Sequence, residues 1–120
     1  MKLEPNVWFD EVVKTYHLIS PHIHHTQLVT CPDLNEELDG MYLFKPESLQ
    51  ITGSFKVRGA LSAISRLSKK ELKRGVIAYS SGNHAQGVAH AAKVFNTPAT
   101  VVMPKDAPER KIANAQALGA

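Results

Sequence analysis

Lys56 lies between Phe55 and Val57 in a segment, GSFKVRGA, that opens with glycine and serine. Near the start of an amphipathic helix, a lysine is in most proteins a solvated surface charge. Apolar neighbours that face a sheet edge can instead desolvate the amine, which disfavours the ammonium form and leaves the nitrogen available for Schiff-base formation. The residue types around Lys56 fit either interpretation.

A second polar segment, SSGNHAQG at residues 80–87, lies where the apolar run VIAYS gives way to a helical pattern. Ligands of open α/β sheets bind at this edge, and the unpaired N–H groups that begin a helix can hold a carboxylate. Gly82 permits close approach of a ligand to the backbone. An ordinary helix cap, made by Ser81 or Asn83, explains the same residues and is favoured when the segment is taken alone.

Other kinds of site find little support in the sequence. It contains no Walker loop, G-x-G-x-x-G, C-x-x-C or H-E-x-x-H motif. His22, His24 and His25 lie close together but lack the cysteine or carboxylate company of a usual zinc site, so we expect a loop or strand-edge role and no metal. The basic run at residues 69–74 includes an acid and no aromatic residue, which favours a solvated helix face over a nucleic-acid surface.

The composition is that of a globular protein the size of one ordinary domain, with a formal charge of +3 over 120 residues. The single cysteine, Cys31, cannot form an internal disulfide, which suits a reducing compartment. The N-terminus lacks an apolar targeting segment, and the longest apolar runs are too short to span a bilayer. We therefore expect a cytoplasmic protein without membrane or nucleic-acid partners.

The elements that must position these residues follow from apolar periodicity. The first half predicts a helix that ends at residues 20–21, short strands within 26–31 and 41–44, a helical turn at 32–38 and a loop at 47–53. A helix is predicted from Ser54, and Ser68 with Glu71 forms a capping box for the next helix, which Gly75 ends. The apolar stripe of the helix from Ser54 consists of Val57, Ala60, Leu61, Ile64 and Leu67.

The second half alternates strand and helix. VIAYS predicts a strand buried on both faces, a helix follows at once, ATVVM is the next strand, and residues 106–119 form the last helix. Such alternation favours a parallel sheet covered by helices. The chain stops where this alternation predicts another strand, so we expect it to be part of a longer sequence with an open sheet edge.

KPESLQITGSFKVRGA, followed by SSGNHAQGVAHAAK, closely resembles the fold-type II pyridoxal-phosphate enzymes, and among them the threonine and serine dehydratases and serine racemase. The likeness extends to ISPHIHHT, VVMPKDAP and the closing ALGA. It implies an α/β fold with an open parallel sheet and flanking helices, similar to the tryptophan synthase β chain. It also implies that residues 1–45 belong to the family's larger domain, and that residues 46–120 form a small α/β domain, incomplete at its C-terminus.

The resemblance assigns a role to each candidate residue. Lys56 forms the internal aldimine with pyridoxal 5'-phosphate, Phe55 lies against the cofactor ring, and Asn83 meets the ring hydroxyl. Ser81 matches the residue that acts as acid and base opposite the lysine in members similar to serine racemase. The residues implied in gripping the substrate carboxylate are Ser80, Ser81, Gly82, Asn83 and His84.

The implied reaction converts L-threonine or L-serine to a 2-oxo acid and ammonia, in a homo-oligomer that takes a small amino-acid substrate. Two alternatives remain open: racemisation of serine, and a non-catalytic fragment that acts only by binding or self-association. The family's glycine-rich phosphate loop and the residue facing the pyridine nitrogen lie further along than residue 120. Catalysis by these 120 residues alone is therefore an open question.

Overall fold

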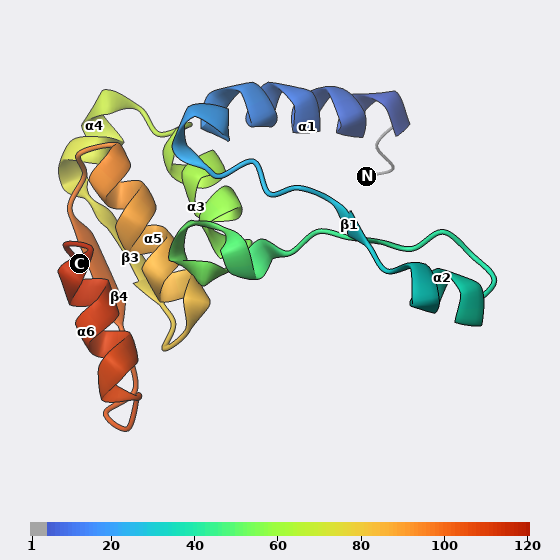
Figure 1. Cartoon of the computed structure of the whole chain (residues 1–120). Helices are drawn as coiled ribbons and strands as arrows, with labels where there is room; N and C mark the ends of the chain where they lie inside the picture. Colours follow the sequence, from blue (N-terminus) through green and yellow to red (C-terminus); the bar gives the residue numbers. More distant parts are fainter. Residues whose placement is uncertain (1–4) are drawn as a thin grey trace.

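A computed structural model describes residues 5–120. Helix α1, Pro5–Ile19, lies along one side of the molecule and ends at the predicted place, where a single 3-10 turn, Ser20–His22, turns the chain (Figure 1). Pro21 lies within that turn, and the residue before a proline is disfavoured in α geometry.

An arm follows α1 and extends away from the rest of the chain (Figure 1). It consists of strand β1, Val29–Thr30, helix α2, Pro32–Glu37, and strand β2, Leu43–Phe44. The two strands are antiparallel, with Val29 opposite Phe44. The predicted strands and helical turn are confirmed, although each strand is only two residues long.

The segment predicted as a loop forms two 3-10 helices, Glu47–Leu49 and Ile51–Gly53. Helix α3, Lys56–Ile64, begins two residues later than predicted. Its expected apolar stripe is confirmed, because Val57, Ala60, Leu61 and Ile64 are all buried and Leu67 packs against them. The capping box is also present: Ser68 Oγ accepts from the Glu71 N–H, and Glu71 Oε2 accepts from the Ser68 N–H, before α4, Lys69–Arg74.

The remaining elements are strand β3, Val76–Tyr79, helix α5, Asn83–Val94, strand β4, Ala99–Val102, and helix α6, Glu109–Ala117. Strands β3 and β4 are parallel, with Val76 opposite Ala99 and Tyr79 opposite Val102. The predicted parallel α/β alternation is therefore confirmed.

The core lies between α3 and α5, where Val57 and Leu61 of α3 are fully buried. Strand β3 contributes only one face, since Ile77 and Tyr79 are 75% and 73% exposed. The prediction that this strand is buried on both faces is wrong for the described residues. The helices pack on the face of Val76 and Ala78, and no described element covers the opposite face.

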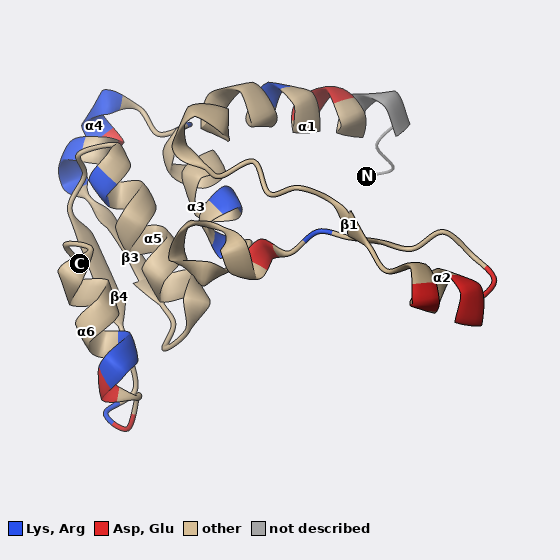
Figure 2. Cartoon of the chain, viewed as in Figure 1, with Lys and Arg blue, Asp and Glu red and all other residues tan. Residues whose placement is uncertain are grey.

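Charged residues are spread over the molecule, with local groups of one sign (Figure 2). Basic residues lie on α4 and at the start of α6, and acidic residues lie on α2. Among residues 5–120, no helix combines the length and apolar character needed to cross a membrane.

Candidate active site

The two motifs meet because α5 packs against the start of α3. Lys56 is the first residue of α3, and Asn83 is the first residue of α5. Gly87, one turn after Asn83, lies so close to α3 that a Cβ there would be 3.1 Å from the Lys56 carbonyl carbon. Asn83 precedes Gly87 by one helical turn, and its side chain contacts Lys111 of α6.

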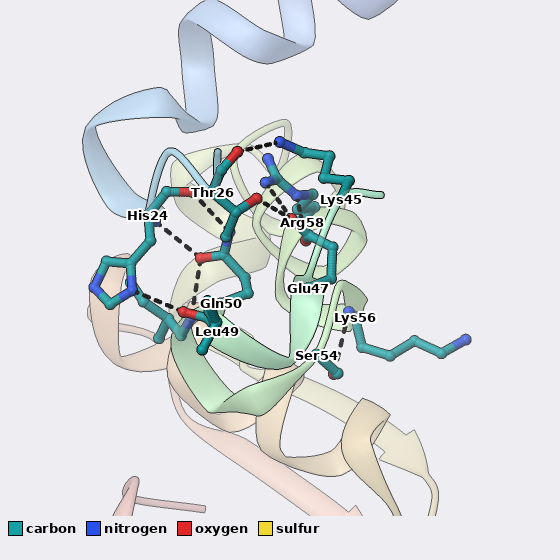
Figure 3. Close-up of polar contacts among 10 residues, drawn as sticks. His24, Thr26, Lys45, Glu47, Leu49, Gln50, Ser54, Lys56 and Arg58 are labelled. Carbon is teal, nitrogen blue, oxygen red and sulfur yellow. Dashed lines mark hydrogen bonds and ion pairs between the residues drawn. The ribbon is translucent and has the colours of Figure 1, made fainter. Parts of the chain in front are cut away.

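Lys56 presents its amine to solvent. The residue is exposed, its Nζ lies 4.9 Å from the centre of the Phe55 ring, and Phe55 is itself 58% exposed. Figure 3 shows the Lys56 side chain extending away from the neighbouring polar cluster. Of the two interpretations of Lys56 that the sequence left open, the structure favours the solvated one, because the helix turns Val57 into the core and leaves Lys56 exposed.

The start of α5 has no side-chain cap. Gly82 occupies the capping position, so the ordinary cap by Ser81 or Asn83 is not formed. Ser80 Oγ accepts from the Gly82 N–H at 3.2 Å, which holds the loop in a tight turn. A Cβ at Gly82 would meet no atom within 4 Å, so the space beside this helix end is open to a ligand.

Asn83 and His84 are both exposed but face different surroundings. Asn83 Oδ1 accepts a hydrogen bond from Lys111 Nζ of α6 at 3.1 Å. His84 lines a cavity of about 300 Å³ with residues of α3, β3 and α5, and neither Lys56 nor Asn83 lines that cavity. The structure thus packs α5, at Gly87, against the first residues of α3, while His84 borders a separate cavity.

An ion pair between Arg58, two residues after Lys56, and Glu47 joins α3 to the segments before it. The Arg58 guanidinium donates two hydrogen bonds to the Glu47 carboxylate, at 2.7 and 2.8 Å (Figure 3). Thr26 Oγ1 donates to the same carboxylate at 2.7 Å, and Lys45 Nζ donates to the Thr26 carbonyl at 2.8 Å. Arg58 is the main reason that the pKa of Glu47 is lowered to about 2, with Thr26 adding to the effect.

Gln50 forms hydrogen bonds that join the segment before α3 to the residues between α1 and the arm. It is 3% exposed, and its Oε1 accepts from the backbone N–H groups of His24 and Ile51 at 2.8 and 2.9 Å. Its Nε2 donates to the His24 carbonyl at 2.8 Å. Neither Gln50 nor the Glu47–Arg58 ion pair could be predicted from the sequence, because a polar residue in an aperiodic segment gives no sign of its distant partners.

The three clustered histidines have separate neighbours. The His22 ring packs edge-on against Phe95, His24 Nδ1 lies 3.2 Å from the Leu49 carbonyl oxygen, and His25 Nδ1 lies 3.4 Å from the Tyr16 hydroxyl. Within residues 5–120, no three His, Cys, Asp or Glu side chains are placed to hold a metal ion together.

Lys56 is exposed at the start of α3, and α5 begins without a side-chain cap. A free amine can react with a carbonyl compound, and the unpaired N–H groups of a helix start can bind an anion. Residues 19–120 match the family described as pyridoxal-phosphate dependent enzyme, and the chain belongs to that family. The fold and family expected from the two motifs are confirmed.

Several relatives are similar over most of the chain. L-threo-3-hydroxyaspartate ammonia-lyase of Saccharomyces cerevisiae is 44% identical over 93% of this chain and 34% of its own length. L-threonine ammonia-lyase of Thermotoga maritima is 46% identical over 95% of this chain and 28% of its own length. The crystal structure of serine racemase from Dictyostelium discoideum matches with a TM-score of 0.89 and 40% identity, over 92% of this chain and 36% of that one. The chain thus spans about a third of the length of such relatives.

The residues present fit the family's cofactor. Pyridoxal phosphate carries an aldehyde, a ring oxygen and an anionic group. The chain offers the exposed amine of Lys56 to the aldehyde and the exposed amide of Asn83 to the ring oxygen, while the hydroxyl and N–H groups of residues 80–83 can serve the carboxylate of a substrate beside it. The open space at Gly82 leaves room beside these donors.

Proposed function

We propose that the protein acts as a pyridoxal-phosphate dependent ammonia-lyase on L-threonine or L-serine. The observation that supports the proposal is the close approach of Gly87 to the Lys56 backbone, which packs α5 against the start of α3, in a chain whose Lys56 side chain is exposed and whose α5 begins without a side-chain cap. The ammonia-lyase relatives support this class of reaction, and the shared substrate feature is a hydroxyl on Cβ of an amino acid.

Each side chain has a defined task in this proposal. Lys56 would hold the cofactor through Nζ, and its free amine would accept the proton from the substrate Cα. Phe55 would lie against the cofactor ring, and the Asn83 amide would bind the ring oxygen. The substrate carboxylate is bound by hydroxyl and N–H groups at the start of α5, where the helix dipole favours an anion. The proposed carboxylate-binding residues are Ser80, Ser81, Gly82, Asn83 and His84.

The overall reaction balances without an external oxidant or reductant. The substrate loses its α-proton and its β-hydroxyl as water, and water then adds as the amino group leaves as ammonia, which gives a 2-oxo acid. Pyridoxal phosphate, when bound, supplies the electron sink that takes up the electrons released at Cα. The protein supplies orientation and proton transfer.

Serine racemisation is the second candidate. It needs a second acid and base on the face opposite Lys56, and Ser81, half-buried in the loop before α5, is the residue proposed for it. The likeness to serine racemase supports this alternative. The stereochemistry of recovered serine separates it from the lyase reaction.

The proposal is tested by mixing the protein with pyridoxal phosphate, reducing with borohydride and mapping the labelled peptide. We expect a single modified lysine, Lys56, which Lys56→Ala abolishes and the surface variant Lys69→Ala does not. Threonine, serine and threo-3-hydroxyaspartate are then assayed for 2-oxo acid and ammonia. Labelling scattered over many lysines would overturn the proposal and favour the non-catalytic alternative.

We also propose residues 46–120 as the unit that carries the site, with residues 1–45 as part of a larger domain. Most buried core residues lie in residues 46–120, which supports this division.

Homo-oligomerisation is proposed because the apolar side chains of Ile77, Tyr79 and Val102 are exposed, and sedimentation velocity tests it. A cytoplasmic location is proposed from the single cysteine, Cys31, and cell fractionation tests it.

A further inference from the structure

Helix α6 donates hydrogen bonds to two amide oxygens on α5. Lys111 Nζ donates to Asn83 Oδ1 at 3.1 Å, and Asn114 Nδ2 lies 3.5 Å from Gln86 Oε1. The partners are three residues apart on both helices, so each pair joins one face of α6 to one face of α5. Asn83 is exposed at the helix start, whereas Gln86 is 8% exposed.

The chemistry of the first pair fixes the direction of the Asn83 amide. An ammonium group has three donors and no acceptor, so it can face only the carbonyl oxygen of Asn83. A flipped amide would place two donor groups against each other at 3.1 Å. The Asn83 NH₂ group is therefore turned away from Lys111 and is left to donate to a ligand.

We propose that Lys111 is a positioning residue that makes Asn83 a hydrogen-bond donor toward the cofactor. A donor at this position favours the deprotonated form of the ring oxygen, because the anionic oxygen is the stronger acceptor. This inference rests on the proposed function, in which Asn83 binds that oxygen. It adds a residue of α6, 28 positions away in sequence, to the determinants of the site.

The alternative is that Lys111 is a surface lysine whose contact with Asn83 merely fastens α6 to α5. The two roles differ in what they change. A fastening role affects stability alone, whereas a positioning role changes the environment of the Asn83 NH₂ group and the affinity for the cofactor. Arg110, the exposed neighbour on the same helix, offers a matched control that removes one positive charge without touching Asn83.

The test compares Lys111→Met, Lys111→Arg and Arg110→Met. The first readout is the ¹⁵N–¹H side-chain amide resonances of Asn83 in the protein without cofactor, assigned from their loss in Asn83→Asp. We expect Lys111→Met to move these resonances, while Lys111→Arg, which keeps a cationic donor, and Arg110→Met leave them near their original positions. Unmoved resonances in Lys111→Met would overturn the inference.

The second readout is the dissociation constant of pyridoxal phosphate, from fluorescence titration. Lys111→Met should raise it about 5- to 10-fold, as expected for one oriented hydrogen bond, and Lys111→Arg should restore most of the affinity. In an Asn83→Ala background, Lys111→Met should have little further effect. Equal effects in both backgrounds would overturn the positioning role. If the unaltered protein binds no cofactor, the proposed function fails, while the amide resonances still decide whether Lys111 orients Asn83.

Discussion

Gly87 lies against the backbone of Lys56, and a Cβ at position 87 would be 3.1 Å from both the Lys56 carbonyl carbon and the Val57 nitrogen. This separation is shorter than ordinary van der Waals contact between such atoms, so the start of α3 can approach α5 only because residue 87 has no side chain.

Gly87→Ala should therefore displace the first turn of α3 and lower the free energy of unfolding by about 1–3 kcal/mol, as for an overpacked core. The control is Gly59→Ala in α3, where a Cβ would meet no atom within 4 Å. That variant should raise stability by about 0.5–1 kcal/mol, because alanine favours a helix more than glycine does. Urea unfolding followed by circular dichroism measures both, and equal effects would contradict the close approach.

Glu47→Gln should weaken the tie between α3 and the segments before it. The pKa of Glu47 is lowered to about 2 from its usual 4.5, so the unfolded chain binds this proton more tightly than the folded protein does. The stabilisation is then complete above the unfolded pKa and is lost as the pH falls from about 5 toward 2.

We expect Glu47→Gln to cost about 1–3 kcal/mol near pH 7, and the difference from the unaltered protein to shrink as the pH falls. Urea unfolding at a series of pH values measures this. Glu36→Gln, at an exposed position of α2, is the control. A difference that stays constant down to the lowest pH would exclude the ion pair as its source.

Gln50→Ala should be more damaging than the loss of an ordinary polar side chain. It would leave the N–H and carbonyl of His24 and the N–H of Ile51 without their present partner. We expect a loss of about 2–4 kcal/mol, since each unpaired group in a buried site carries a desolvation cost. Urea unfolding measures the change, with Gln27→Ala, at an exposed position, as a control that should change stability little. An equally small change for Gln50→Ala would show that the Gln50 hydrogen bonds do not stabilise the fold.

Thr52→Gly should stabilise the protein. Thr52 has a φ of +64°, which is unfavourable for a β-branched residue, and its buried Oγ1 has no hydrogen-bond partner within the described part of the chain. Removing both penalties should outweigh the added flexibility of glycine and gain about 0.5–1.5 kcal/mol. Thr100→Gly in β4 should have the opposite sign, because glycine weakens a strand. The midpoint of thermal unfolding is measured for both variants. A lower midpoint for Thr52→Gly would show that the backbone conformation of Thr52 is not strained.

Patterns among residues close together in the sequence predicted the helices, the strands and the helix cap that those residues form. The α3 stripe, the Ser68–Glu71 capping box and the strand–helix alternation all arise from residues within a few positions of one another. The contacts that shape the candidate site join distant positions: Glu47 with Arg58, Gly87 with Lys56, and Lys111 with Asn83. A single sequence carries no periodic signal for such pairs. The exposure of Lys56 was left open by the sequence for a related reason, since its neighbours Phe55 and Val57 lie on different sides of the helix start.

The arm formed by β1, α2 and β2 has a consequence for hydrogen exchange. Its strands are two residues long, and Val29, Leu43 and Phe44 are all exposed, so little buried apolar surface holds it closed. Local opening there costs much less than global unfolding, and the arm amides should exchange with deuterium well before those of α3 and α5. The buried stretch of α3 from Val57 to Leu61 should exchange slowly, so we expect opening of the arm to leave the packing of α3 against α5 intact.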